Sequence, residues 1–187
     1  MIEIEEFTKK LSEKTPTPGG GSVLGVLSAL GVSLISMSLR FSIKEDSEKT
    51  LEIRELLKFL NKKRIFFLRY IRKDQISYLK KDDFKSASVV LKELLESIEE
   101  TAKKLKNIFK ILNKNLISDF YLGLKLLEFS FKGAVLILKE NYIFTKKRKT
   151  FIKNLIKKFD KKNIFDFKEI DKFLEKRYGN FIRGKKI

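Results

Sequence analysis

The sequence predicts an all-α protein, a bundle of about six helices around one buried central helix. Its 187 residues include only two prolines and nine glycines, which leaves little material for the frequent turns of a many-stranded fold. Apolar side chains recur at the three- and four-residue spacing of helices through most of the chain. Residues 15–39 carry no charge, which is typical of a helix that other elements surround. We expect one domain over residues 1–187.

The first two elements are a short helix over residues 2–12 and a long helix over residues 22–41, separated by a loop rich in proline and glycine. Ile4, Phe7 and Leu11 share one face of the short helix. Ser22 is the expected N-cap of the long helix. Small residues at helical spacing would let another helix, from this chain or from a second copy, pack closely against the long helix: Gly21, Gly25, Ser28, Ala29, Val32 and Ser36.

A third and a fourth helix are expected after a polar connection over residues 43–49. Apolar positions at helical spacing place the third helix between Leu51 and about Lys80. Asp82 or Asp83 is the expected cap of the fourth helix, whose apolar face extends to Phe109.

Three further helices complete the expected fold. A fifth runs through Leu138, a sixth over residues 145–160 is strongly basic, and a short seventh segment closes the chain. Capping residues mark their ends: Asn115 or Ser118 for the fifth helix, and Asp166 with Glu169 at the start and Gly179 at the end of the last one.

The composition excludes several kinds of chemistry. The chain contains no cysteine and no histidine, so disulfides and a Ser-His-Asp triad are impossible. Zinc and iron sites of the usual kind lack their ligands, and we expect no metal and no cofactor. Any acid–base catalysis must therefore use Asp, Glu, Lys, Tyr or an ordered water.

The charge of the chain is strongly positive and uneven. The net charge is +18, and residues 145–187 contribute 16 Lys or Arg against 5 Asp or Glu, a balance of +11. This end of the chain could meet nucleic acid, an anionic membrane or an acidic small molecule. The simpler interpretation is a lysine-rich composition on solvated helix faces.

The uncharged stretch over residues 15–39 raises the question of a membrane span. It begins with proline and glycine and carries five serines, which favours a buried helix in a globular protein over a transmembrane segment. Residues 1–12 are acidic and amphipathic, unlike a signal peptide, so we expect a cytoplasmic protein.

The loop before the long helix is the first candidate site. Both prolines and three of the nine glycines lie within residues 16–21. Bare glycine backbone can take positive φ and expose N–H groups, and the helix that follows adds the positive end of its dipole, a combination that suits an anionic or polar ligand. A tight turn between helices explains the same pattern. The candidate binding residues are Thr17, Pro18, Gly19, Gly20, Gly21 and Ser22.

Two further polar groups are candidates. Asp74 lies one helical turn from Ile71 and from Tyr78, so it could face inward with a raised pKa and move protons, or it could face solvent beside Arg72 and Lys73. Asn115, Ser118 and Asp119 cluster with Asn113 at the expected start of the fifth helix, where plain capping is the alternative to a binding role.

Three motifs together resemble the formiminotransferase-cyclodeaminase C-terminal domain and the stand-alone methenyltetrahydrofolate cyclohydrolases. The loop and helix from Pro16 to Met37 resemble the family's first signature. Asp74 with Ser77 and Tyr78 is similar to its Asp-x-x-Ala-aromatic motif, with serine in place of alanine. Residues 113–119, Asn-Lys-Asn-Leu-Ile-Ser-Asp, resemble its Asn-x-Asn-x-x-Ser-Asp motif. The three occur in the family's order over most of residues 5–141.

The resemblance implies an all-α homodimer that acts on a one-carbon tetrahydrofolate. It adds water to, or removes ammonia from, the carbon that bridges N5 and N10. Asp74 is then the expected proton donor and acceptor, and Asp119 a second catalytic carboxylate. Asn115 and Ser118 are expected to bind the heterocycle, and the loop residues 17–22 to wall the site. The basic end of the chain is expected to hold the glutamate tail of the folate.

Two alternatives remain open at this point. Arg40 and Ile137 stand where the family usually has asparagine, which favours a catalytically inactive relative that serves as a dimeric binding scaffold. Alternatively, the aromatic residues between the C-terminal lysines, such as Phe151 and Phe159, favour a basic bundle that binds nucleic acid.

Overall fold

The computed structural model describes residues 3–43, 48–79, 84–145 and 149–182. This part of the chain holds seven α-helices, two short 3-10 helices and no strand, as the sequence predicts for an all-α fold. The elements follow in the order α1 (Ile4–Ser12), α2 (Gly20–Arg40), α3 (Glu48–Leu79), α4 (Phe84–Leu105), η1 (Ile108–Lys110), η2 (Lys114–Leu116), α5 (Ile117–Phe144), α6 (Lys149–Phe159) and α7 (Lys168–Ile182).

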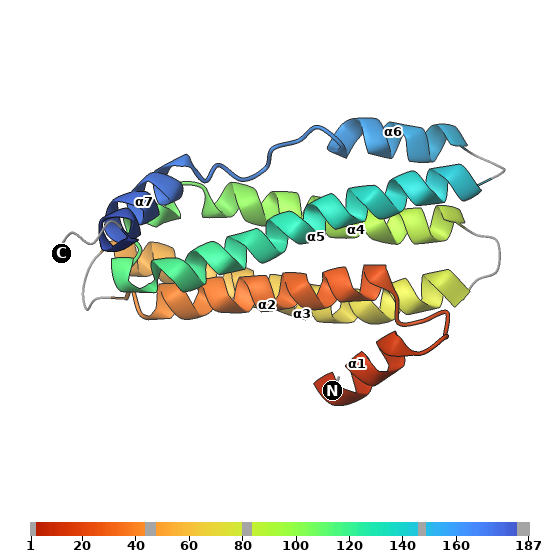
Figure 1. The fold of residues 1–187 in the computed structure, drawn as a ribbon, viewed down its shortest axis with the longest axis horizontal. Coiled ribbons are helices and arrows are strands. Elements are labelled where there is room, and N and C mark those ends of the chain that lie inside the picture. Colours follow the sequence, from red (N-terminus) through yellow and green to blue (C-terminus); the bar gives the residue numbers. More distant parts are fainter. Residues whose placement is uncertain (1–2, 44–47, 80–83, 146–148, 183–187) are drawn as a thin grey trace.

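Four long helices form an antiparallel bundle (Figure 1). α2 packs against both α3 and α5, and α4 completes the ring between α3 and α5. Successive helices reverse direction, so the start of α2 and the end of α3 lie at one end of the bundle, while the end of α2 and the start of α5 lie at the other. α6 runs along α5, and α7 lies across the second end.

The long uncharged helix takes the central position that its composition predicts. Val32, Ile35 and Leu39 of α2 have no exposed surface. Its hydrophobic partners come from every other helix of the ring, and the largest fully buried side chains include Phe67 of α3 and Phe120 of α5. Burial of this kind contributes about 1.5–3 kcal/mol for each large side chain.

Glycines let α2 approach both of its neighbours closely. A Cβ added at Gly25 would lie 2.9 Å from the ring of Tyr70 on α3. On the α5 side, a Cβ at Gly31 would lie 2.8 Å from the carbonyl oxygen of Gly123, and one at Gly123 would lie 2.7 Å from the carbonyl oxygen of Gly31. The small residues of α2 therefore receive helices of the same chain.

Several expected helix ends differ from the observed ones. α2 begins at Gly20 with Gly19 as N-cap, so Ser22 is inside the helix and free to use its hydroxyl elsewhere. Leu116 precedes α5, and no side chain caps it. The Lys168 backbone N–H donates to Asp166, as expected for the cap of α7. Gly179 does not end this helix, which continues to Ile182, and a Cβ added at Gly179 would meet no other atom. The proposed caps Asp82 and Asp83 lie outside the described residues.

Among the described helices, α2 alone is long and apolar enough to cross a membrane. More than half of its apolar window is buried inside the bundle, between α3 and α5. The same length and hydropathy are typical of the core helix of a globular bundle.

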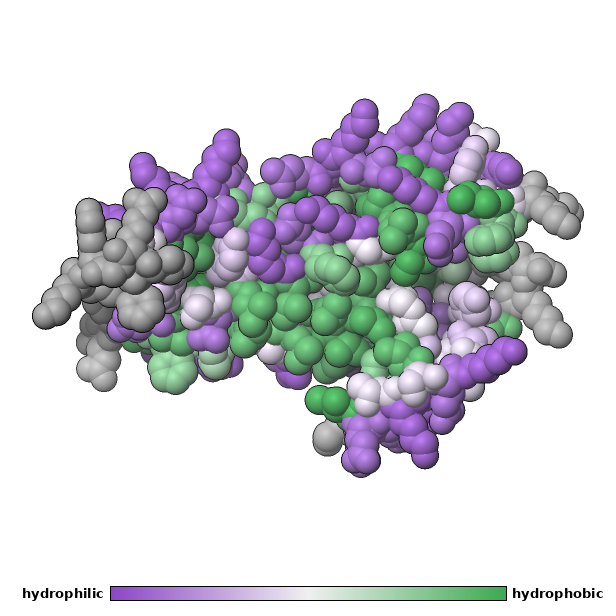
Figure 2. Space-filling view, viewed as in Figure 1, coloured by the Kyte–Doolittle hydropathy of each residue, from purple (hydrophilic) through white to green (hydrophobic). Residues whose placement is uncertain are grey.

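The surface of the bundle is divided between charged and apolar regions. Figure 2 shows a continuous apolar area over α2 and α5, bordered by polar side chains. Exposed apolar side chains on these two helices include Leu30 of α2 and Leu122, Phe129 and Leu136 of α5, which are 48–62% exposed. We refer to these four residues as the apolar face.

Candidate functional site

Asp74 meets the first turn of α2 at one end of the bundle. Its carboxylate lies so close to Gly21 that a Cβ added there would be 2.1 Å from Oδ1. The Ser22 hydroxyl donates a hydrogen bond of 2.8 Å to Oδ2 of Asp74. We call Gly19–Ser22 together with Asp74 the glycine end of the bundle.

The surroundings of Asp74 change its acidity. Burial raises the pKa of the Asp74 carboxyl, because a charge is costly away from water, while the hydroxyl and backbone N–H of Ser22 oppose this by stabilising the charged form. Asp74 therefore faces inward, one turn after the buried Ile71, although Tyr78 on its other side is exposed. A partly buried carboxyl with a raised pKa is suited to accept and return a proton at higher pH than an ordinary aspartate.

The glycines before α2 do not take the positive φ angles that the sequence analysis considered for a ligand-binding loop. Gly19 has a φ of −129°, and Gly20 and Gly21 are already helical, so the glycines provide closeness rather than a left-handed turn. The first turn of α2 faces Asp74 of the same chain, and the Ser22 N–H supports its charge. Pro18 is buried, Thr17 is partly buried, and the bond between them is cis.

α5 contributes its last turns to the glycine end. A Cβ added at Gly20 would lie 3.5 Å from Cδ1 of Ile137, an ordinary contact. One turn further on, the buried amide of Asn141 donates a hydrogen bond of 3.3 Å to Ser88 of α4. The buried polar groups of this end thus come from all four helices of the bundle.

The second polar motif, residues 113–119, lies at the opposite end. The Asn113 backbone N–H donates to Oγ of Ser42 at 2.8 Å, just beyond the C-terminus of α2, and its side chain accepts a 3.0 Å hydrogen bond from the Asn115 N–H. Asn115 and Ser118 are exposed, and Asp119 is partly exposed in the first turn of α5. We call residues 113–119 the asparagine end.

The two groups of predicted site residues are therefore separated within one chain. α2 has 21 residues, and at 1.5 Å per residue it holds the two ends about 30 Å apart (Figure 1). Thr17 to Ser22 and Asp74 come together, whereas Asn115, Ser118 and Asp119 do not join them in the same chain.

The basic C-terminal third is partly neutralised by acids of α4. Lys158 pairs with Glu96 at 2.7 Å, and Lys162 pairs with Glu99 at 2.8 Å. These contacts attach the C-terminal third to the bundle and reduce the charge it presents. Among the described residues, no group of three or more acidic side chains gathers as metal ligands would.

Two residues near these sites were missed in the sequence. Tyr70 lies one turn before Asp74, is fully buried, and its hydroxyl has no hydrogen-bond partner among the described residues. Arg177 of α7 donates to the carbonyl oxygen of Lys114 at 2.7 Å and reaches Oδ1 of Asn115 at 3.5 Å. The spacing of Tyr70 and Asp74 could have indicated the first. Nothing local indicates the second, because it depends on where α7 docks.

Comparisons with known proteins agree with the sequence motifs. A family model described as formiminotransferase-cyclodeaminase matches residues 3–81, a range that contains the glycine end. The fold is similar to that of formiminotetrahydrofolate cyclodeaminase from Thermotoga maritima, with a TM-score of 0.76 and 23% sequence identity over 85% of this chain and 87% of that one. A search of curated proteins gave no match. The resemblance to the formiminotransferase-cyclodeaminase family is thereby confirmed over residues 3–81, and the fold of the chain agrees with it, while the motif at residues 113–119 lies outside the family match.

Proposed function

We propose that this protein is an enzyme that acts on the one-carbon unit of a tetrahydrofolate, as a methenyltetrahydrofolate cyclohydrolase or a formiminotetrahydrofolate cyclodeaminase. The observation that carries the proposal is the Asp74 carboxyl, partly buried against Gly21 and hydrogen-bonded by Ser22. The family match includes these residues, and the named structural relative is a cyclodeaminase.

In the cyclohydrolase reaction, Asp74 would act as the base. Water attacks the cationic carbon that bridges N5 and N10, and the carboxylate takes the proton that the water loses. The bond from N5 to this carbon then breaks, N5 receives a proton, and the one-carbon unit stays on N10 as a formyl group. The negative charge of Asp74 also favours the cationic carbon before attack.

In the cyclodeaminase reaction, the same carboxyl would act as the acid. N10 attacks the formimino carbon on N5 and loses its proton, while the nitrogen of the formimino group is protonated and leaves as ammonia. The product is the methenyl cation. The raised pKa of Asp74 keeps a protonated fraction available at higher pH than for an ordinary aspartate.

The working unit in this proposal is a homodimer that pairs through the apolar face. Leu122, Phe129 and Leu136 repeat every seven residues along α5, so they share one face of it. Leu30 directly precedes Gly31 of α2, and Leu122 directly precedes Gly123 of α5, the two glycines at which the helices meet. Monomeric proteins rarely leave a continuous apolar area of this kind in water. A second copy is a fitting occupant, because a two-fold pairing covers the same area on both chains.

A dimer also accounts for the separation of the two ends. If the two-fold axis lies in the apolar face and crosses the helices, each helix faces an antiparallel copy of itself. The asparagine end of one chain then approaches the glycine end of the other. Each complete site would combine Asp74 from one chain with Asn115, Ser118 and Asp119 from its partner, and the dimer would hold two such sites.

The direct test is to incubate the purified protein with methenyltetrahydrofolate and, separately, with formiminotetrahydrofolate, and to follow the absorbance of the methenyl chromophore. We expect turnover of one of them by the wild type and a loss of at least about a hundredfold in Asp74→Asn. Thermal melting with each folate shows whether the variant still binds.

The outcomes separate the alternatives. Folate binding without turnover by the wild type would identify an inactive relative. Stabilisation by a short oligonucleotide and by neither folate would identify a nucleic-acid-binding bundle. Turnover by Asp74→Asn at the wild-type rate would refute the role of this carboxyl.

A further inference from the structure

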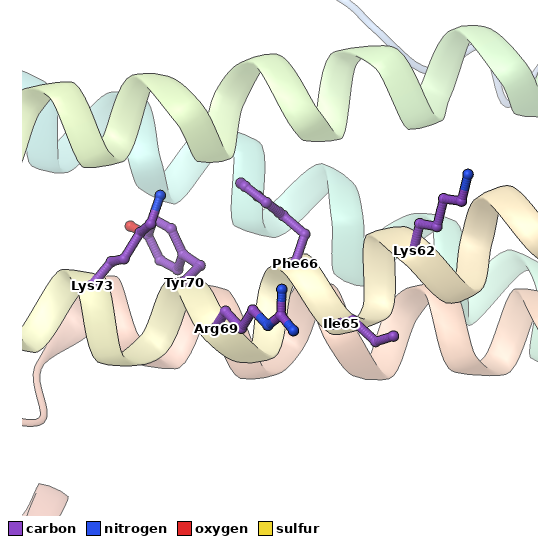
Figure 3. A pocket seen from close by; sticks show the side chains of 6 residues that line it. All are labelled: Lys62, Ile65, Phe66, Arg69, Tyr70 and Lys73. Carbon is purple, nitrogen blue, oxygen red and sulfur yellow. The ribbon is translucent and has the colours of Figure 1, made fainter.

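A hollow of about 440 Å³ follows the outer flank of α3, on the side that α4 borders (Figure 3). Three cationic side chains, Lys62, Arg69 and Lys73, share it with the apolar side chains of Ile65 and Phe66. Tyr70 forms its wall at the end nearest Asp74, and Lys73 directly precedes Asp74 in the chain. The hollow therefore begins beside the glycine end and runs away from it along α3.

The charge of the hollow is only partly neutralised by the protein. Lys73 pairs with Glu93 of α4 at 2.8 Å. Lys62 and Arg69 form no ion pair among the described residues, whereas neighbouring Lys63 is paired with Glu100. Lys62 contributes to lowering the pKa of Glu55 on the same helix without an ion pair to it. Two cations that line one hollow without ion-pair partners are suited to carboxylates or other anions.

A buried donor lies in the wall of the same hollow. The hydroxyl of Tyr70 has no exposed surface and no hydrogen-bond partner within the described part of the chain. Most buried hydroxyls in native proteins are satisfied, so this enclosed and unpaired donor is a point at which the wall of the hollow is polar without being open to it. Figure 3 shows this hydroxyl at the end of the hollow where Lys73 also stands.

We propose that this hollow binds the aminobenzoyl-glutamate tail of the substrate, with Ile65 and Phe66 against its aromatic ring and Lys62 and Arg69 on its carboxylates. This inference rests on the proposed function, since a folate joins an aromatic ring to glutamate carboxylates. Lys62 and Arg69 are two helical turns apart, about 10 Å along the axis, so a tail with several glutamates reaches both. The assignment moves tail binding from the basic C-terminal third to α3.

The test measures binding of the tail alone, without any reaction. p-Aminobenzoyl-triglutamate and p-aminobenzoyl-monoglutamate are titrated into the full chain by calorimetry. We expect the triglutamate to bind the wild type more tightly, and the double variant Lys62→Gln/Arg69→Gln to lose about tenfold of that affinity, as expected for two exposed ion pairs. Salt should weaken binding to the wild type and change it less in the variant.

Lys153→Gln/Lys157→Gln on α6 is the matched control, because it removes two exposed cations of the C-terminal third. It should bind the triglutamate as the wild type does. Equal binding by the α3 variant and the wild type, or an equal loss in the α6 control, would overturn the assignment.

A second variant tests the buried donor. Tyr70→Phe removes only the hydroxyl, so its melting temperature should not fall, since no hydrogen bond within the described residues is lost. Because the hydroxyl has no exposed surface, we expect the affinity for the triglutamate to stay that of the wild type. A severalfold loss would show that binding opens this wall of the hollow.

Asp74→Asn distinguishes this inference from the proposed function. It should bind the triglutamate with wild-type affinity while losing turnover. Tail binding in a wild type that turns over neither folate would refute the activity and leave the site standing. Turnover by a wild type that binds no tail would refute the tail site and leave the proposed activity standing.

Discussion

The two ends of the bundle use similar polar residues in different ways. At the glycine end, Asp74 is pressed against helical backbone because Gly21 has no side chain, and its acidity changes with burial. At the asparagine end, Asn113 satisfies the backbone of Asn115, and the side chains of Asn115 and Ser118 remain exposed. Close packing thus encloses a carboxylate at one end, while the other presents hydrogen-bonding groups at the surface.

The largest effect is expected from a substitution that prevents the close approach of Asp74 to Gly21. In Gly21→Ala, the new Cβ would overlap the Asp74 carboxylate, so the carboxylate must move. A displacement of about 1 Å at a reacting group costs on the order of a hundredfold in rate, and we expect a loss of this size. Steady-state turnover of the preferred folate measures it.

Gly20→Ala provides the control for this variant. Its Cβ would make only an ordinary contact with Ile137, at 3.5 Å, and alanine is the better helix former. We expect near wild-type turnover and an equal or higher melting temperature. Equal losses in the two variants would mean that Gly21 matters for the helix and not for Asp74.

A smaller effect is expected at the asparagine end. Asp119→Asn removes a carboxylate that would orient the substrate, and we expect a loss of about tenfold in kcat/KM. Mixing inactive Asp74→Asn chains with a stronger variant, Asp119→Ala/Asn115→Ala, then tests whether the two ends combine across a dimer. After exchange, hybrid dimers would carry one intact site, and activity should recover to about a quarter of the wild-type rate.

Mixtures that stay as inactive as their components, although exchange is complete by mass measurement, would contradict a site shared between chains. The variant Phe129→Glu places a charge on the apolar face. Its molar mass in light scattering should be closer to that of a monomer than the mass of the wild type is. A monomeric wild type would end the dimer proposal at once.

The hydrogen bond from Ser22 offers a subtler change. Ser22→Ala removes a donor that stabilises the charged form of Asp74, so the pKa of this carboxyl should rise further. The acid limb of the pH–rate profile for hydration, which needs the carboxylate, should move to higher pH, with less than about a tenfold loss well above it. An unmoved limb would show that another group controls it.

The smallest expected effect is on stability. The folded-state pKa of Asp74 lies above its unfolded value, so above both values the folded chain carries the cost of a buried charge. Asp74→Asn should therefore melt at the same temperature as the wild type or slightly higher at pH 7. This advantage should shrink as the pH falls below the raised pKa of the folded state and vanish only below the pKa of the unfolded state, where the carboxyl is neutral in both. A lower melting temperature at pH 7 would indicate that the charge is stabilising.

The fold could be predicted from the sequence to a large extent, and the arrangement of its ends only in part. The uncharged stretch over residues 15–39 predicts a buried central helix, whereas periodicity left Asp74 open between an inward position on α3 and a solvent-facing one beside Arg72 and Lys73. The meeting of Asp74 with Gly21 depends on how α2 and α3 pack along each other, which no local pattern specifies. For the same reason, the motif at residues 113–119 did not indicate that it would lie at the opposite end of the bundle from Asp74.

Contacts between residues far apart in the sequence could not be predicted from local patterns. Ser22 was expected as a cap, because serine before an apolar helix usually serves there, and its bond to Asp74 spans 52 positions in the chain. The charge of the C-terminal third was interpreted first as lysines on solvated helix faces, with an anionic partner as the alternative. Lys158 and Lys162 instead pair with Glu96 and Glu99 of α4, which periodicity alone leaves as solvated residues.

The contact between Gly31 and Gly123 has a consequence for how a substrate enters. Each backbone carbonyl occupies the space where the other residue would place a Cβ, so α2 and α5 can neither slide nor rotate against each other without a clash. The contact in the middle of α2 thus also fixes the position of its first turn. In the proposed reaction, the segment before Gly20 is then the part free to move when a bulky pterin enters, and stiffening that segment should slow association while leaving the chemical step unchanged.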